Sequence, residues 1–353
     1  MARIAVIPGD GIGVDVIAEG VKVLETLKEV RGIDLELEFF DYGAEYYLKT
    51  GQAMPPGQVE EFAKNFSAIY FGAVGDPRLP IETYGKELLF GMRWGLDLYV
   101  NLRPVKLLDT SLTPLKDMRE EDINFVIVRE NTEGLYAMMG GNFKKGTRDE
   151  IAIQEDINTY TGVERVIRFS FDYAKKKGLK RVAMAHKSNA LYYGHGLWVR
   201  VFYEVAKDYP DIEAKDFYID NLVMQMIKRP QQFEVIVTCN MFGDIISDLG
   251  AQMVGGLGLA PSGNINPHGT SMFEPVHGSA PKYAGKNIAN PIGAILTAQM
   301  MLDHLGFARE AQMIEEAVVE ALRNKMTPRE LGGNLGTREV GDYICSTIRR
   351  EGG

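Results

Sequence analysis

The chain has 353 residues, of which 45% are hydrophobic and 25% are charged, and this predicts a globular protein of about two domains. Its 39 Lys and Arg residues are outnumbered by 48 Asp and Glu residues, and the formal net charge of −9 argues against a nucleic-acid-binding surface. The longest uncharged apolar stretch, residues 288–302, is shorter than the roughly 20 residues that span a membrane. We therefore expect neither a nucleic-acid partner nor membrane insertion.

The cysteine content indicates a reducing compartment. Cys239 and Cys345 are the only cysteines in the sequence, and two distant thiols cannot build a disulfide framework or a four-thiolate metal site. The apolar run before Pro8 is too short for a secretory signal peptide. A cytoplasmic protein is the expectation.

Short β-favouring apolar runs alternate along the chain with segments of helical periodicity. Strands are expected at residues 4–7, 35–40, 68–71, 125–128, 182–185 and 235–238, and helices at 14–27, 162–177, 291–305 and 309–325. This alternation predicts an α/β fold with a largely parallel sheet. Residues 255–275 are rich in Gly, Pro and Asn, which predicts a long irregular loop.

The first predicted strand leads into a glycine-rich turn, Gly9–Gly13. Its G-x-G-x-G spacing departs by one residue from the dinucleotide-binding fingerprint, and no strand-end acidic residue follows after about 20 residues. A tight strand-to-helix turn is the favoured interpretation. It leaves open that the turn lines a cleft.

Three of the predicted strands end directly before polar residues. Arg129 follows one strand, His186 and Lys187 follow another, and Asn240 comes just after the third. Open α/β sheets bind ligands at the carboxyl ends of their strands. The pattern therefore predicts one binding site.

Asp244 and Asp248 are separated by one helical turn, which places both carboxylates on one face of a helix, with Cβ atoms about 6 Å apart. Two like charges so placed destabilise a helix unless a cation lies between them, and their hard oxygen atoms suit Mg²⁺ or Mn²⁺. The alternative is an acidic first turn that is favoured by the helix dipole. That alternative accounts for Asp244 better than for Asp248.

Arg93, Arg103 and Arg129 are candidate carboxylate-binding residues, because a guanidinium group binds a carboxylate through two parallel hydrogen bonds. A cluster of them indicates a substrate with more than one carboxylate. Any single arginine is more often part of a surface ion pair, but Arg129, at the end of a buried strand, fits that alternative least.

Lys187 and His277 each allow two interpretations. A lysine in a cleft near a metal can act as a general base, although a lone lysine is more commonly solvated. His277 either contacts an adenine ring or only shapes its loop. The five histidines include no H-x-x-x-H pair and the chain has no G-x-S-x-G motif, which disfavours zinc or serine hydrolysis.

Taken together, the motifs resemble those of the β-decarboxylating dehydrogenases, and the resemblance covers essentially the whole chain. The motifs that carry it are residues 7–13, 101–104, 128–134, 186–189, 242–248, 277–281 and 288–291. The resemblance implies a two-domain isopropylmalate/isocitrate dehydrogenase-like α/β fold, with a mixed, largely parallel sheet and a non-Rossmann dinucleotide site. Residues 1–98 and 253–353 would form the cofactor-side domain. Residues 99–252 would form the central domain, with the dimer interface and the substrate and metal residues.

The resemblance also implies roles for individual residues in a homodimer with shared active sites. By position, Arg93, Arg103 and Arg129 resemble the carboxylate clamps and Tyr136 the general acid. Lys187 and Asp220 resemble residues that the partner subunit contributes, and Asp220 would join Asp244 and Asp248 around Mg²⁺ or Mn²⁺. The remaining expected contacts are Leu89, Phe90 and Asn189 to the substrate, and His277, Gly278, Ser279, Ala280, Pro281, Lys282, Tyr283 and Asn290 to the cofactor.

Within this family the expected substrate is a 2-hydroxy di-acid. Isocitrate dehydrogenases carry polar residues before the position of Arg93, whereas this chain has Leu89 and Phe90. An apolar wall suits a branched alkyl group and leaves an extra carboxylate unpaired. This favours 3-isopropylmalate, which would be converted to 2-oxo-4-methylpentanoate and CO₂. Residues 130–133 and 187–189 are closer to the tartrate/D-malate branch, which is the alternative, ahead of homoisocitrate or isocitrate.

The cofactor signals conflict. Lys282 stands where NAD-dependent relatives commonly have Asp, and the pair Lys282–Tyr283 resembles NADP-dependent isocitrate dehydrogenases. The pair Ile288–Ala289 resembles the NAD type. NAD is favoured and NADP stays open. A catalytically silent regulatory subunit is the non-enzyme alternative, but it predicts the loss of metal or base residues that this chain retains by type.

Overall fold

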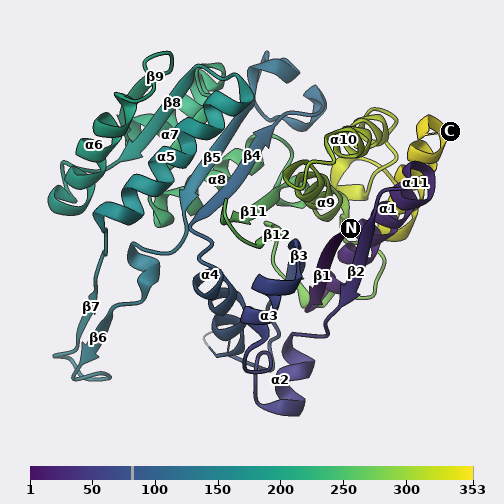
Figure 1. Cartoon of the computed structure of the whole chain (residues 1–353), viewed down its shortest axis with the longest axis horizontal. Helices are drawn as coiled ribbons and strands as arrows, with labels where there is room; N and C mark the ends of the chain where they lie inside the picture. The colour runs from purple at the N-terminus through teal and green to yellow at the C-terminus, as the bar shows by residue number, and fades with distance from the viewer. Residues whose placement is uncertain (81–82, 353) are drawn as a thin grey trace. The chain divides into compact units, whose positions relative to one another are not determined.

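The computed structural model describes residues 1–80 and 83–352. The chain divides into two compact units (Figure 1). Unit 1 contains Met1–Leu98, Leu107–Glu120 and Ala251–Gly353, and unit 2 contains Tyr99–Lys106 and Glu121–Gly250. The sequence analysis placed residues 107–120 in the central domain. They belong to unit 1 instead, where Glu120 accepts a hydrogen bond from Arg323 (3.1 Å) and Leu112 lies against Gly255.

Unit 1 is built around five strands in the order β2 (Leu35–Phe39), β1 (Ala2–Gly9), β3 (Ala68–Ala73), β12 (Ser271–Pro275) and β11 (Pro261–Ile265). All neighbours are parallel except β11 and β12. The helices α1 (Ile12–Arg31) and α9 (Ile292–His304) pack on one face of the strands, and α10 (Ala308–Arg323) and α11 (Thr337–Gly352) pack on these helices.

The other face of the unit 1 sheet is covered by shorter elements. These are α2 (Ala44–Thr50), α3 (Gln58–Asn65), the π-helical turn η1 (Lys86–Phe90) and α4 (Gly91–Gly95). Ala5 and Ile7 of β1 and Ile69 and Phe71 of β3 are buried there in one cluster with Phe62, Leu88 and Met92. The alternation along each strand is the period-2 pattern of a sheet covered on both faces.

Unit 2 has a second set of five strands, in the order β4 (Val100–Lys106), β5 (Asn124–Glu130), β10 (Val235–Thr238), β8 (Arg181–His186) and β9 (Glu213–Tyr218). Only β4 is antiparallel to its neighbour. Its helices are α5 (Tyr160–Lys177), α6 (Tyr192–Ala206), α7 (Ile219–Lys228) and the part of α8 (Asn240–Met253) up to Gly250. The predicted α/β class with a mixed, largely parallel sheet is confirmed.

The prediction of an irregular loop over residues 255–275 is wrong, because this segment contains the antiparallel pair β11 and β12. Its polar residues Ser262, Asn264 and Ser271 are almost completely buried. Asn264 satisfies its amide by donating to Glu274 (2.8 Å). A strand composed of small, buried polar residues has the composition of a loop, so its sequence does not distinguish the two.

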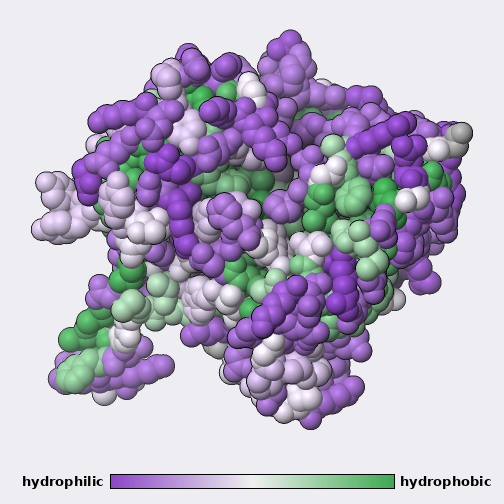
Figure 2. All heavy atoms as spheres, viewed as in Figure 1, coloured by the Kyte–Doolittle hydropathy of each residue, from purple (hydrophilic) through white to green (hydrophobic). Residues whose placement is uncertain are grey.

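A second hairpin, β6 (Gly140–Phe143) and β7 (Ile151–Gln154), was not predicted. Figure 1 shows it extending away from the sheet and helices of unit 2. Every residue of both strands is exposed, and Phe143, Ile151 and Ile153 each retain more than half of their accessible surface. Apolar side chains are visible on this projection in Figure 2. Among the described residues, no helix has the length and apolar character needed to cross a lipid bilayer.

Candidate active site

The strand order of unit 2 brings together the three polar strand ends that the sequence identified. β10 lies between β5 and β8 and is parallel to both, and Thr238 pairs with Arg129 on one side and with Ala185 on the other. Arg129, His186 and Asn240 therefore lie at one edge of the sheet, as predicted. The chemistry of this edge depends on how each side chain is held.

Arg129 is the most completely buried charged group of the site, with 2% of its surface exposed. Its Nε and Nη2 both donate to Oδ1 of Asn240, at 3.0 and 2.7 Å. Its Nη1 donates to Asp244, and its guanidinium carbon lies 5.1 Å from the centre of the Tyr136 ring. The arginine is thus fixed in a fork-like arrangement.

The close approach of α8 to Arg129 explains a glycine in the motif Phe242-Gly243-Asp244. A Cβ atom added at Gly243 would lie 2.6 Å from both Cβ and Cγ of Arg129, well inside ordinary van der Waals contact. Glycine at this position lets the first turn of α8 pass over the arginine. Asn240, one turn earlier, also donates to the carbonyl oxygen of Glu133 (3.3 Å) and ties the helix to the loop that carries Tyr136.

Arg103, on β4, lies on the same side of α8. Its Nε donates to Asn101 (2.7 Å) and its Nη1 donates to Ser247 (2.6 Å). The same Nη1 is 3.5 Å from a carboxylate oxygen of Asp244 and 3.7 Å from one of Asp248. Both aspartates lie on one face of α8, as their spacing predicted, and this face is turned toward the two buried arginines.

The two aspartates of α8 differ in their surroundings. Asp244 accepts a hydrogen bond from the hydroxyl of Tyr136 (2.9 Å) in addition to its arginine contacts, and its side chain is 38% exposed. Asp248 is 57% exposed. Desolvation and the charge of Asp244 raise the pKa of Asp248, against the opposing effect of Arg103 and Arg129. A cation beside both carboxylates would relieve this repulsion.

These two carboxylates fit a hard divalent cation by donor type, but they do not complete a site within the chain. Across residues 1–80 and 83–352, no group of three or more His, Cys, Asp or Glu side chains is arranged to hold a metal ion. Asp220, which the resemblance assigns to the metal site of a partner subunit, forms an ion pair with Lys187 of its own chain at the start of α7.

Lys187 and Asp220 form a second small cluster in unit 2. The Lys187 side chain is 28% exposed and that of Asp220 is 60% exposed, so both remain accessible. Asn189 is exposed in the same loop after β8. Lys187 and Asn189 thus follow the end of β8, and Asp220 at the start of α7 pairs with the ammonium group of Lys187.

In unit 1, Arg93 is 6% exposed and donates through Nη2 to Glu274 (3.2 Å). Its Nε is buried without a hydrogen-bond partner, which leaves one donor for a ligand. Phe90 lies beside it, with its ring centre 5.4 Å from the guanidinium carbon and 5.3 Å from the Trp94 ring centre. Leu89 packs against the core cluster of unit 1.

The predicted cofactor loop, residues 277–283, packs against the glycine-rich turn of unit 1. The backbone N–H of Ile12 donates to the carbonyl oxygen of Ser279 (2.7 Å). A Cβ at Gly11, where φ is +57°, would lie 2.1 Å from that oxygen. The amides of Asp10 and Gly13 also donate to backbone carbonyls. Three N–H groups of the turn are thus used within the protein, which supports a structural turn rather than a phosphate cradle.

The loop itself has features that fit a dinucleotide. His277 Nε2 is buried and has no hydrogen-bond partner, and burial lowers the pKa of His277, so the ring is neutral. Lys282 and Tyr283 are exposed, with the ammonium 4.7 Å from the ring centre. Asn290 donates to Glu330 (2.8 Å). Gly278, Ala280 and Pro281 complete the exposed or half-buried part of the loop.

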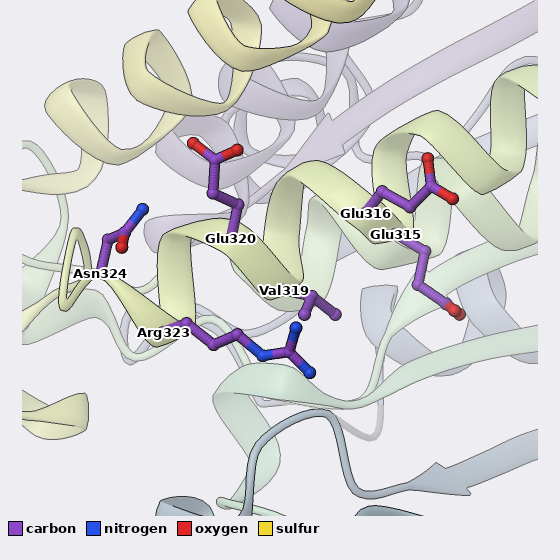
Figure 3. A pocket seen from close by; sticks show the side chains of 6 residues that line it. All are labelled: Glu315, Glu316, Val319, Glu320, Arg323 and Asn324. Carbon is purple, nitrogen blue, oxygen red and sulfur yellow. The ribbon is translucent and has the colours of Figure 1, made fainter.

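A shallow pocket elsewhere in unit 1 carries no such chemistry (Figure 3). It is lined by residues from one end of α10 and the turn that follows, namely Glu315, Glu316, Val319, Glu320, Arg323 and Asn324. Glu320 accepts hydrogen bonds from Tyr343 and Arg350, and Arg323 is paired with Glu120. These charges are already compensated within the protein.

Sequence reasoning missed three residues that hold the arginines, namely Asn101, Ser247 and Glu274, and it named Asn240 only as a polar residue after a strand. Asn101 stands inside the motif 101–104, and Glu274 is the only charged residue between positions 255 and 275. An isolated acidic residue in an otherwise uncharged stretch was the available signal for Glu274. Ser247 gave no sequence signal, because a serine on a helix cannot be distinguished from other surface serines unless its hydrogen-bond partner is known.

Comparisons with known proteins agree with this architecture. Residues 3–344 match the model of the isocitrate/isopropylmalate dehydrogenase family. The chain is 45% identical to the 3-isopropylmalate dehydrogenase of Thermobifida fusca over 352 residues, which is 99% of this chain and 98% of that protein. It is 42% identical to the probable tartrate dehydrogenase/decarboxylase of Bacillus subtilis, over 99% and 98% of the two chains.

Solved structures give the same result. The isocitrate dehydrogenase of Methylococcus capsulatus has a TM-score of 0.86 at 36% identity, and the match covers 99% of this chain and 100% of that one. A β-decarboxylating dehydrogenase of Thermococcus kodakarensis has a TM-score of 0.82 at 36% identity, with 99% and 97% covered. The chain therefore belongs to the isocitrate/isopropylmalate dehydrogenase family. It is a decarboxylating oxidoreductase of a family that uses a divalent metal and NAD(P), so the resemblance is confirmed.

Proposed function

We propose that this enzyme oxidises and decarboxylates a 2-hydroxy di-acid, and that its substrate is 3-isopropylmalate, which yields 2-oxo-4-methylpentanoate and CO₂. The observation that supports this most directly is the grouping of Arg103, Arg129, Tyr136, Asp244 and Asp248 at one edge of unit 2. Buried cations, a phenol and two carboxylates on a rigid helix match the needs of a reaction in which negative charge develops on a bound di-acid.

Each residue of the group has a task that follows from its surroundings. Arg103 and Arg129 hold positive charge where water is excluded and bind the substrate carboxylates. The hydroxyl group of Tyr136 donates a hydrogen bond to Asp244. This contact positions the phenol as the acid that protonates C3 after CO₂ leaves. The pair of Lys187 and Asp220 removes the proton of the C2 hydroxyl: the Asp220 carboxylate accepts it, or Lys187 accepts it as an amine after passing its own proton to Asp220.

Two groups that the protein binds supply the remaining chemistry. Asp244 and Asp248 would hold Mg²⁺ or Mn²⁺, with Asp220 of a second chain, and the ion when bound serves as a Lewis acid. The 277–283 loop and Asn290 would hold the dinucleotide, which when bound accepts the hydride from C2. NAD is the proposed dinucleotide. Exposed Lys282 keeps NADP as the alternative, because its ammonium group is free to approach a phosphate.

The choice of substrate rests on unit 1. Phe90 and Trp94 place aromatic surface beside Arg93, and a carboxylate against such a wall loses hydration without gaining a partner. A branched alkyl group has no such cost. A tartrate or D-malate substrate is the second candidate, since a relative at 42% identity is named a probable tartrate dehydrogenase/decarboxylase.

We further propose a homodimer with shared active sites. The exposed apolar side chains of the β6–β7 hairpin and the incomplete metal site within the described part of one chain both support it. Mixing two inactive variants tests the proposal. A hybrid of Lys187→Met and Asp248→Asn subunits contains one site with both residues intact, so activity should return after subunit exchange. Separate sites in each chain would leave the mixture inactive.

The substrate is tested by following reduction of NAD and NADP with isopropylmalate, D-malate, tartrate, isocitrate and homoisocitrate at equal Mn²⁺. We expect the highest kcat/KM with isopropylmalate and NAD, and no activity after complete chelation with EDTA. A tricarboxylate as the best substrate would refute the role given to Phe90. Full activity in EDTA would refute the metal-dependent reaction.

A further inference from the structure

The backbone after β8 is held by two buried histidine rings. The N–H of Lys187 donates to Nδ1 of His195 at 2.8 Å, and the N–H of Ser188 donates to Nδ1 of His186 at 3.2 Å. His195 is 1% exposed and His186 is 2% exposed. Loop amides after a strand commonly bond to water, so a dry imidazole acceptor for each of two successive amides is an unusual arrangement.

The ring of His195 is itself fixed. Because Nδ1 accepts a hydrogen bond, its proton must be on Nε2, and burial lowers the pKa of His195 to about 4, which keeps the ring neutral. The ring packs edge-on against Phe242 of α8, with centres 5.2 Å apart. Its own backbone N–H donates to Leu191 (2.9 Å) in the first turn of α6.

The helix that carries His195 is also anchored. Trp198 donates its indole N–H to Asn158 (2.8 Å), and a Cβ at Gly194 would lie 2.7 Å from the amide nitrogen of Asn158. The neighbouring ring of His186 donates through Nε2 to Asp216 (2.9 Å), which also accepts from Tyr203. The orientation of each histidine ring is therefore fixed by hydrogen bonds and packing with neighbouring helices and strands.

We propose that His195 is a positioning residue for Lys187, and that its Nδ1 holds the lysine backbone so that the ammonium group stays on Asp220. Only the backbone of Lys187 touches the histidine, and its side chain reaches the partly exposed ion pair. A small rotation of the backbone at Lys187 is amplified at the ammonium group, because the side chain is long. This inference rests on the proposed role of Lys187 as the base.

The test compares His195→Leu with His195→Asn. The two side chains have the same number of heavy atoms and the same branching, and both remove the ring, but Asn places a polar acceptor close to the position of Nδ1. We expect His195→Leu to lower the single-turnover rate by about ten- to a hundredfold with little change in KM, and His195→Asn to recover most of that rate. Equal rates in the two variants would overturn the proposal.

Two further measurements make the test decisive. In a Lys187→Met background, His195→Leu should cause no additional loss, whereas an additional loss would mean that His195 does not act through Lys187. If His195→Leu fails to fold, His195→Gln replaces it, because Gln carries its acceptor one methylene further out and should not restore the rate. The single variant Lys187→Met separates the two hypotheses: a normal rate refutes the base, while a lost rate beside a normal His195→Leu refutes only the positioning role.

Discussion

Replacement of Asn240 by Leu is the sharpest test of how the site is held. Asn240 is 1% exposed, and its Oδ1 accepts from both Nε and Nη2 of Arg129. Leucine has the same number of heavy atoms and the same branching but no acceptor, so two hydrogen bonds to a buried charge are lost. At about 1.5 kcal/mol each, the variant should lose about 3 kcal/mol of unfolding free energy. The freed guanidinium should also lower kcat/KM by about a hundredfold.

Asn240→Asp is the comparison variant, because it retains an acceptor for Arg129, while it adds a negative charge beside the guanidinium and loses the longer bond to Glu133. Urea denaturation followed by tryptophan fluorescence gives the stability, and initial rates with the best substrate give kcat/KM. We expect the Asp variant to be the more stable of the two. If Asn240→Leu matches the wild type in both measurements, Arg129 is not held by Asn240 and the account of the site is wrong.

Three other predictions concern separate features. Gly243→Ala should lower the unfolding free energy by about 1–3 kcal/mol, because the added Cβ would meet Arg129. Gly196→Ala is the control in α6, where open space surrounds the glycine, and it should raise the unfolding free energy by up to about 1 kcal/mol. Equal denaturation midpoints for the two variants would contradict this prediction. The lowered pKa of His195 means that the unfolded chain binds more protons as pH falls from 6.5 to about 4, so about 3 kcal/mol of unfolding free energy should be lost across that window. His195→Asn should remove this pH dependence, and an unchanged slope would refute it. Asp248→Asn should raise the Mn²⁺ concentration for half-maximal activity by at least about tenfold, and an unchanged requirement would exclude Asp248 as a ligand.

The sequence predicted the charged residues of the candidate active site better than the uncharged residues that hold them in place. Arg129 was identifiable because a charged residue directly follows a buried apolar strand, and Asp244 and Asp248 because their spacing places them on one helical face. Both signals are local. Asn240 and Ser247 are partners of arginines more than 100 positions away. The position of Asn240 after a strand placed it at the site, but neither residue showed which arginine it holds until the docking of α8 was known.

The sequence did not predict either of the two hairpins, and the reasons are opposite. β11 and β12 are buried but consist of small polar residues, so their tertiary environment overrides a loop-like composition. β6 and β7 are fully exposed and are joined by a highly charged loop, so no buried face imposes a readable period. In both cases the missing information is what covers the strand, which a single sequence does not carry.

The link between the Gly9–Gly13 turn and the 277–283 loop has a consequence for how the protein can change over time. Ile12 and Ser279 are joined through main-chain atoms, so exchanging either side chain leaves the bond in place. Gly9, Gly11 and Gly13 are constrained, because a Cβ at each would lie 2.0–2.5 Å from a backbone carbonyl oxygen, which at Gly11 is that of Ser279. Substitutions of side chains in this loop can therefore change which ligand it prefers, while the main-chain hydrogen bond that anchors the loop to the turn after the first strand is kept.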